Sequence, residues 1–136
     1  MTSSATEARI VEILRHALPD LQLVVLFGSR ARGAGRDSSD HDVAILTPRP
    51  LPALRRFELA EDLASVLGTD VDLIDLRAAD TVLRSQVVTT GRVLHTVRGN
   101  DVEAFLDFVY ADYARLNEER AAILRDVRER GRIHAR

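Results

Sequence analysis

The sequence predicts an α/β fold that carries a long C-terminal helix. Short apolar segments bounded by turn residues alternate with segments in which apolar residues recur at helical spacing. From Asn100 onward, neither Gly nor Pro appears before Gly131, which favours one uninterrupted helix. A length of 136 residues fits one domain with one core. We therefore expect a single domain over residues 1–136, with its core at about 5–97 and the C-terminal helix at about 100–130.

The first half of the chain predicts a helix and a strand in that order. Ser4 and Glu7 have the S-x-x-E pattern of a capping box, apolar residues follow at helical spacing, and Pro19 marks an end. We expect this helix at about residues 5–18. The run LQLVVLF at 21–27 is short, continuous and apolar, which is typical of a central strand covered on both faces.

The remaining elements are separated by turn chemistry. GSRARGAGRDSS is a turn, DHDVAIL (40–46) reads as a strand, and three prolines close together then interrupt regular structure. A helix at about 54–67 carries Leu59, Ala60, Leu63, Val66 and Leu67 on one face and stops at Gly68. DVDLIDL predicts a strand, a short helix ends at Gly91, and RVLHTV predicts the last strand. These three elements span about 70–76, 79–90 and 92–97.

Composition excludes several kinds of chemistry. All 19 basic residues are Arg, so a Walker-type lysine, a Schiff-base lysine and a lysine general base are excluded. The absence of Cys excludes disulfides and thiolate sites. A net charge of -2 gives no general attraction to nucleic acid, and no apolar segment approaches the roughly 20 residues that span a bilayer. The N-terminal segment is amphipathic rather than signal-like, so we expect a cytoplasmic protein without membrane or direct nucleic-acid partners.

Three aspartates indicate a metal site. Asp40 and Asp42 are two positions apart along a strand, so their side chains point to the same face. Two carboxylates this close repel each other unless a cation lies between them, and oxygen ligands suit Mg²⁺ or Mn²⁺. Asp72 lies within the next strand and supplies a third carboxylate. Two-metal sites of this kind hold the attacking and leaving oxygens of an in-line displacement.

The turn before Asp40 suits a phosphate group. Gly28 lets the backbone approach a ligand, and Ser29 offers a hydroxyl and an amide. Arg30 and Arg32, with Arg36 further on, carry guanidinium groups that pair with phosphate oxygens. A phosphate-binding turn beside three carboxylates predicts transfer of a nucleotidyl group from a nucleoside triphosphate, with release of pyrophosphate.

The pattern Gly-Ser, a spacer of ten residues and Asp-x-Asp resembles the signature of the polymerase-β-like nucleotidyltransferases. GSRARG and the later VDLIDL most resemble the minimal nucleotidyltransferases (MNT), which include the antitoxins of HEPN/MNT toxin–antitoxin pairs. The resemblance covers about residues 21–97. It implies a small mixed sheet flanked by helices, triphosphate binding by Gly28 and Ser29, and two metal ions held by Asp40, Asp42 and Asp72.

The same resemblance implies a function. Antitoxins of this type transfer AMP from ATP to a tyrosine of the partner HEPN ribonuclease, and Asp72 would act as the general base on the acceptor hydroxyl. Two alternatives stay open: an antitoxin that acts by binding alone, and an enzyme that modifies a small molecule, as aminoglycoside nucleotidyltransferases do. The short chain after residue 97 leaves the latter little room for an acceptor domain.

Other polar residues near these motifs have simpler interpretations. His41 alternates away from Asp42, so we expect a packed or surface histidine and not a ligand. We expect Asp70 and Asp75 to be solvated, with a helix cap as the alternative for Asp75.

The C-terminal helix carries an apolar stripe over about 28 residues, from Val102 to Val127. Such a helix is roughly 42 Å long, whereas a domain of this size has a radius of gyration near about 14 Å. One end should therefore overhang the core or bend back over it. The stripe either covers the open face of the sheet or offers a docking surface to a toxin protomer or to a second copy of the chain.

Overall fold

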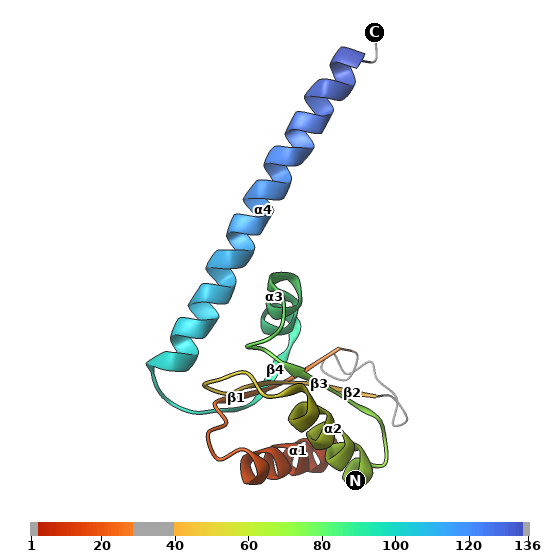
Figure 1. Ribbon diagram of the computed structural model, residues 1–136, viewed down its shortest axis with the longest axis vertical. Coiled ribbons are helices and arrows are strands. Elements are labelled where there is room, and N and C mark those ends of the chain that lie inside the picture. The colour runs from red at the N-terminus through yellow and green to blue at the C-terminus, as the bar shows by residue number, and fades with distance from the viewer. Residues whose placement is uncertain (1–2, 29–39, 135–136) are drawn as a thin grey trace.

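The computed structural model describes residues 3–28 and 40–134, which form helices on both sides of a sheet (Figure 1). The elements in chain order are α1 (Ser3–Ala17), β1 (Leu23–Phe27), β2 (His41–Leu46), α2 (Ala53–Leu67), β3 (Val71–Asp75), α3 (Thr81–Thr90), β4 (Arg92–Thr96) and α4 (Asn100–His134). Each helix and strand that the sequence predicts is present, with ends that differ by at most four residues. Among the described residues, no helix is both long and apolar enough to cross a membrane.

The sheet is mixed, with strand order β3-β2-β1-β4. β1 pairs antiparallel with β2 and with β4, whereas β2 and β3 run parallel. The first four residues of β1 are buried, and the strand has a neighbour on each side. This confirms the prediction that LQLVVLF forms a covered central strand, although regular pairing begins at Leu23.

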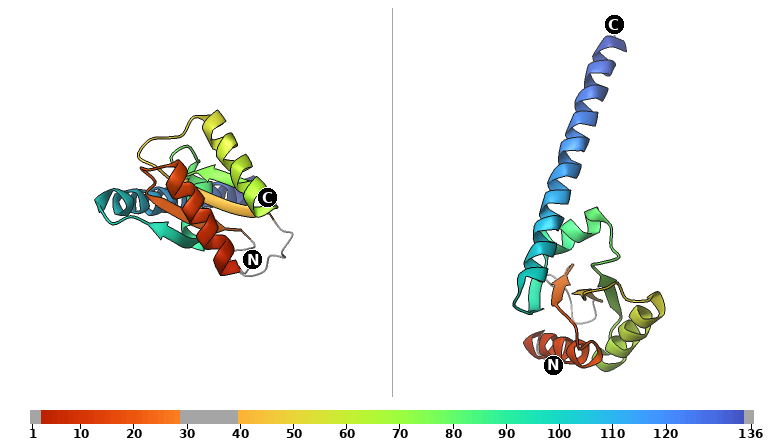
Figure 2. Two further views of the ribbon diagram at one scale, coloured as in Figure 1. Left: turned by 90° about the horizontal axis from the view of Figure 1, so that it is seen from below. Right: turned by 60° about the vertical axis from the view of Figure 1, so that its left-hand side comes forward.

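Helices cover both faces of the sheet (Figure 2). α1 and α2 bury apolar residues such as Ile10, Leu14 and Leu63 against one face, together with Val43 and Ile45 of β2. On the other face, α3 and the first turns of α4 pack against alternate residues of the strands. The buried residues of this second layer are Leu23, Val25, Ala44, Leu46, Leu76, Val87, Val102, Phe105 and Val109. The two faces of β2 are therefore distinct, and each side chain on the strand belongs to one of them.

α2 departs from its predicted pattern at one position. Leu59 and Leu63 are buried and Ala60 and Leu67 pack against the core, as expected. Val66, predicted on the same face, is 45% exposed, although Leu67 beside it packs against the core. Gly68 ends the helix in a left-handed conformation, as predicted.

α4 overhangs the rest of the molecule (Figures 1 and 2). Its 35 residues correspond to about 52 Å of helix. Val102, Phe105 and Val109 near its start are buried, whereas Ile123 and Val127 are more than half exposed. The prediction that one end of the helix leaves the core is confirmed, and the helix continues through Gly131.

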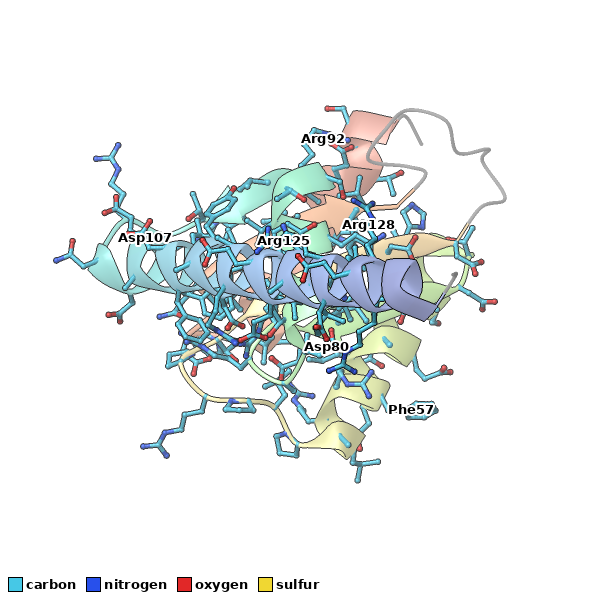
Figure 3. All side chains as sticks on the ribbon, turned by 90° about the horizontal axis from the view of Figure 1, so that it is seen from above. Phe57, Asp80, Arg92, Asp107, Arg125 and Arg128 are labelled. Atoms are coloured by element: carbon cyan, nitrogen blue, oxygen red, sulfur yellow. The ribbon has the colours of Figure 1, made fainter. Side chains whose placement is uncertain are left out.

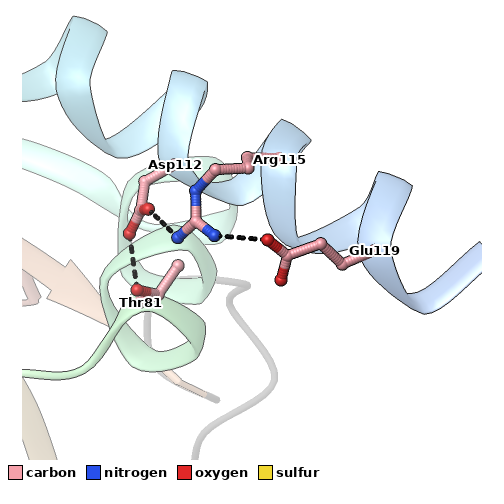
Figure 4. Close-up of polar contacts among 4 residues, drawn as sticks. All are labelled: Thr81, Asp112, Arg115 and Glu119. Carbon is pink, nitrogen blue, oxygen red and sulfur yellow. Dashed lines mark hydrogen bonds and ion pairs between the residues drawn. The ribbon is translucent and has the colours of Figure 1, made fainter.

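Polar contacts fix α4 at the point where it leaves α3 (Figure 4). Thr81 Oγ1 at the start of α3 donates a hydrogen bond of 2.5 Å to Asp112 Oδ2. Arg115 bridges Asp112 and Glu119 at 2.6 and 2.7 Å. The hydrogen bond from Thr81, followed by the one from Arg115, lowers the pKa of Asp112. Beyond this junction α4 has solvent on all sides in the described structure.

Candidate active site

Asp42 and Asp72 lie side by side on parallel strands. The β2–β3 register pairs Asp42 with Asp72, and the β1–β2 register pairs Asp42 with Phe27. Neighbouring strands lie about 4.8 Å apart, so the two carboxylates leave the sheet close together. Asp42 shares a strand face with Ala44, which packs against α3 and α4. Asp72 shares a face with Ile74, which packs against the same layer, so both acids belong to this face. Asp40, which was predicted to share a face with Asp42 along the strand, directly precedes β2.

Gly28 follows β1 directly and lies against Asp42. Its φ is +75°, and a Cβ atom at this position would be 2.2 Å from Asp42 Oδ2. Both the backbone conformation and the contact therefore require glycine. The main chain at Gly28, where the predicted phosphate-binding turn begins, thus lies against the carboxylate of Asp42, which is a predicted metal ligand.

The charges of Asp40 and Asp72 act on Asp42. Asp40 is exposed and directly precedes β2, Asp42 is half-buried, and Asp72 is exposed. Burial first, then the charge of Asp72 and then that of Asp40 raise the pKa of Asp42. Within residues 3–28 and 40–134, no cationic side chain forms an ion pair with any of the three. The described part of the site therefore concentrates negative charge, which a cation would relieve.

The donor chemistry fits a divalent cation that is shared with a nucleotide. The described part of the chain gathers no set of three His, Cys, Asp or Glu side chains that could hold a metal ion by themselves. Mg²⁺ does not need such a cage, because it commonly binds one or two carboxylates together with substrate phosphates and water. Asp42 and Asp72 supply carboxylates in register, and Asp40 adds a third charge beside them.

Some predicted site residues lie outside the described part of the chain. These are Ser29, Arg30 and Arg32, together with Arg36. Their roles in binding phosphate stay predictions.

His41 is a packed residue, as predicted. It is 4% exposed, on the face opposite to Asp42, and its Nδ1 lies 2.8 Å from Thr69 Oγ1. Thr69 was not among the residues that the sequence singled out. Its position in the turn just before β3 could have indicated a contact with β2, because the first residues of the two strands pair.

Asp75 corrects one prediction. We expected a solvated residue or a helix cap, but its side chain is 5% exposed and accepts hydrogen bonds from the backbone N–H groups of Leu51 and Arg77 at 2.8 and 3.0 Å. It shares a face with Leu73, which faces the α1–α2 layer, so strand alternation carries it inward. The cap of α3 is Asp80, whose Oδ1 accepts from Leu83 N. Asp70 is exposed, as expected.

Two cavities lie near opposite ends of β3. One of about 360 Å³ is lined by Asp40, Ala64, Gly68, Thr69 and Asp70. The other, of about 390 Å³, is lined chiefly by Arg77, Arg84 and residues of α4, and includes none of the three acids. Asp40 forms part of the wall of the first cavity, whereas neither cavity is lined by Asp42 or Asp72.

Comparison with known proteins identifies the family. The family described as "Polymerase beta, Nucleotidyltransferase" matches residues 8–98, which include every strand and all of the predicted site. This chain belongs to the polymerase beta nucleotidyltransferase family. The family match ends just before α4.

Relatives of this nucleotidyltransferase cover nearly its whole length. It is 46% identical over 121 residues to protein adenylyltransferase MntA of Shewanella oneidensis, which is 89% of this chain and 86% of the relative. A chain from a crystal structure of a toxin–antitoxin with AMP-PNP superposes with a TM-score of 0.79 at 45% identity, covering 89% of this chain and 97% of the other. A structure of tri-AMPylated Shewanella oneidensis HEPN toxin with MNT antitoxin gives a TM-score of 0.77 at 42% identity, covering 93% and 98%. The predicted fold, enzyme class and resemblance to the MNT antitoxins are confirmed.

Proposed function

We propose that this nucleotidyltransferase transfers AMP from ATP to a tyrosine hydroxyl of a HEPN ribonuclease and so acts as its antitoxin. The observation that carries the chemistry is the in-register pair of Asp42 and Asp72 beside Gly28. The choice of acceptor draws on the near full-length similarity to a protein adenylyltransferase and to the antitoxin in a structure that contains an AMPylated toxin.

The reaction forms a bond between the acceptor oxygen and the α-phosphorus of ATP and breaks the bond from that phosphorus to the bridging oxygen. Pyrophosphate leaves. Asp40, Asp42 and Asp72 would hold Mg²⁺ or Mn²⁺, which when bound supplies positive charge for the phosphate oxygens. The exposed carboxylate of Asp72 takes the proton of the acceptor hydroxyl. Gly28 would bring backbone to the triphosphate, and Ser29, Arg30 and Arg32 are the further residues that the sequence predicts to bind it.

The free end of α4 suits a protein acceptor. An apolar stripe begins at the buried residues Val102 and Val109 and continues at the exposed residues Ile123 and Val127. Successive members are seven, fourteen and four positions apart, which keeps them on one side of the helix. An exposed apolar stripe on an overhanging helix marks an interaction surface. We assign it to the HEPN protein, because the reaction needs an acceptor held beside the sheet. A second copy of the chain is the alternative occupant.

The test of the proposed activity is the intact mass of the purified HEPN partner after incubation with this chain, ATP and Mg²⁺. We expect a gain of one or more AMP units, no gain without Mg²⁺, and a block of ribonuclease activity. Asp62→Asn on α2 is the matched control, because Asp62 is exposed on the helix layer opposite to the carboxylates. An unmodified partner that is nevertheless inhibited equally by wild type and Asp42→Asn would contradict the proposal and support inhibition by binding alone.

The docking assignment is tested separately with Ile123→Glu. We expect this change to weaken binding of the HEPN protein about tenfold or more, because it places a charge on the apolar stripe. Arg125→Glu is the control, since residue 125 lies on the opposite side of the helix (labelled in Figure 3) and also changes the charge. Unchanged binding, or a dimer of the chain alone that dissociates on Ile123→Glu in sedimentation, would assign the stripe to a second copy instead.

A further inference from the structure

A hydrogen bond between two elements lies behind the predicted metal-binding acids. His41 is the first residue of β2, and Thr69 lies in the turn between α2 and β3. Their side chains are joined by a bond of 2.8 Å between Nδ1 and Oγ1 across 28 residues of sequence. The histidine is 4% exposed, so this bond satisfies a polar group within the α1–α2 layer.

The bond reinforces the end of the β2–β3 pairing at which the acids lie. The backbone N–H of His41 donates to Asp70 O at 3.0 Å, and His41 pairs with Val71 at the edge of the ladder. The following pair is Asp42 with Asp72. The side-chain bond to Thr69 thus joins the same two segments one residue beyond the backbone bond, and only one position from the carboxylates.

This end of the sheet needs such a link. Two carboxylates in register on adjacent strands repel each other, and strand ends separate more easily than strand centres. Asp40 lies outside the strand and directly precedes His41. Thr69 and Asp70 also line the cavity whose wall includes Asp40. Loss of the side-chain bond would therefore let Asp40 and Asp42 move relative to Asp72.

We propose that His41 and Thr69 form a positioning pair that holds Asp40 and Asp42 beside Asp72 in the geometry that binds the divalent cation. The pair touches neither substrate nor cation and acts through the spacing of the two strands. The inference rests on the proposed function for its link to AMP transfer, but not for its effect on cation binding.

The chain offers matched variants for a test. Thr69→Val removes the hydroxyl with little change in shape, and Thr69→Ser restores a hydroxyl. Thr47→Val is the control, because Thr47 is buried just beyond the other end of β2 and its hydroxyl donates to Arg49 O at 2.6 Å. All three are compared with wild type by Mn²⁺ titration in the presence of AMP-PNP, followed by electron paramagnetic resonance, by thermal unfolding, and by the rate of AMP transfer against Mg²⁺ concentration.

We expect Thr69→Val to bind Mn²⁺ about three- to tenfold more weakly and to need correspondingly more Mg²⁺ for half-maximal transfer, as befits one lost hydrogen bond. Thr69→Ser should recover most of this loss. Thr47→Val should lower the midpoint of thermal unfolding without changing either cation measurement, and this separates a positioning role from a merely structural one.

Several outcomes would overturn the inference: wild-type Mn²⁺ affinity in Thr69→Val, an equal loss in Thr47→Val, or no Mn²⁺ binding by wild type at all. If wild type binds Mn²⁺ but modifies no HEPN protein, the proposed function fails, and the Mn²⁺ comparison alone decides the role of the pair.

Discussion

Asp72 and Asp75 lie three positions apart on β3 and have similar neighbours in the sequence VDLIDL, yet one side chain is exposed and the other is buried. Asp75 is buried, and two backbone N–H groups donate to its carboxylate. Asp72 is exposed, faces the other side of the sheet, and stands in register with Asp42, whose pKa it raises.

The two acids differ in whether hydrogen-bond donors of the fold compensate their charge. Asp75 has its donors within the fold and so stabilises the connection that follows β2. The Asp42–Asp72 pair has only like charge nearby among the described residues, an arrangement that costs stability unless a ligand supplies the opposite charge. We therefore expect substitutions at the two places to affect different quantities.

The largest expected effect is on catalysis by Asp72→Asn. This change keeps the size of the side chain but removes its charge and its ability to accept a proton, so AMP transfer should fall by about a hundredfold or more. Initial rates of mass gain on the HEPN protein measure the loss, with Asp62→Asn as the matched control. Because Asp72 is exposed, the urea midpoint for unfolding of Asp72→Asn should stay near that of wild type. Transfer at the wild-type rate would show that Asp72 is not the base.

Two glycines sharpen the comparison at the site. Gly28 and Gly68 have φ values of +75° and +73°, but only Gly28 would place a Cβ atom against Asp42, whereas Gly68 has nothing within 4 Å. Both alanine variants should lose about 1 kcal/mol from the left-handed conformation. Gly28→Ala should in addition lose about tenfold or more in transfer rate. Equal rates in the two variants would mean that the close approach of Gly28 to Asp42 does not contribute to catalysis.

A smaller effect should appear in the pH dependence of stability. The pKa of Asp42 is raised in the folded state above its usual 3.8, so the folded chain holds this proton at pH values where the unfolded chain has lost it. The raised pKa of Asp42 therefore contributes stability at pH values below the pKa of the unfolded chain. This contribution is lost as the pH rises through the pKa of the folded chain. The unfolding free energy of Asp42→Asn relative to wild type should therefore increase between about pH 4 and about pH 7. Urea titrations over this range measure it, and a constant difference would contradict the shift.

Sequence patterns predicted most of the fold because its elements are locally consistent. Continuous apolar runs predicted the covered strands, Gly68 and Gly91 predicted helix ends, and the lack of breaks between Asn100 and Gly131 predicted the overhanging helix. The strand order β3-β2-β1-β4 and the registers depend on contacts between distant segments, which no local pattern contains.

At the site, the residue types were predictable and their partners were not. The spacing of Asp40 and Asp42 predicted a shared face, and Asp72 was predicted as a third carboxylate from another strand. The register of β2 with β3 places Asp72 beside Asp42, whereas Asp40 precedes β2. The error at Asp75 came from treating the strand end as solvated, although its alternation with Leu73 already pointed inward. The bond between His41 and Thr69 links residues 28 positions apart and became visible only in three dimensions.

The most direct test of the opposite roles is a paired measurement on Asp42→Asn and Asp75→Asn, in which AMP transfer to the HEPN protein and the free energy of unfolding are determined for both. We expect Asp42→Asn to lose about a hundredfold or more in transfer rate with no loss of stability. Asp75→Asn should lose about 1–3 kcal/mol of stability, because a backbone N–H is left without its acceptor, while it keeps near wild-type transfer at a temperature where it is folded. If Asp42→Asn transfers AMP as fast as wild type, or Asp75→Asn is the inactive but stable variant, this assignment of the two acids is wrong.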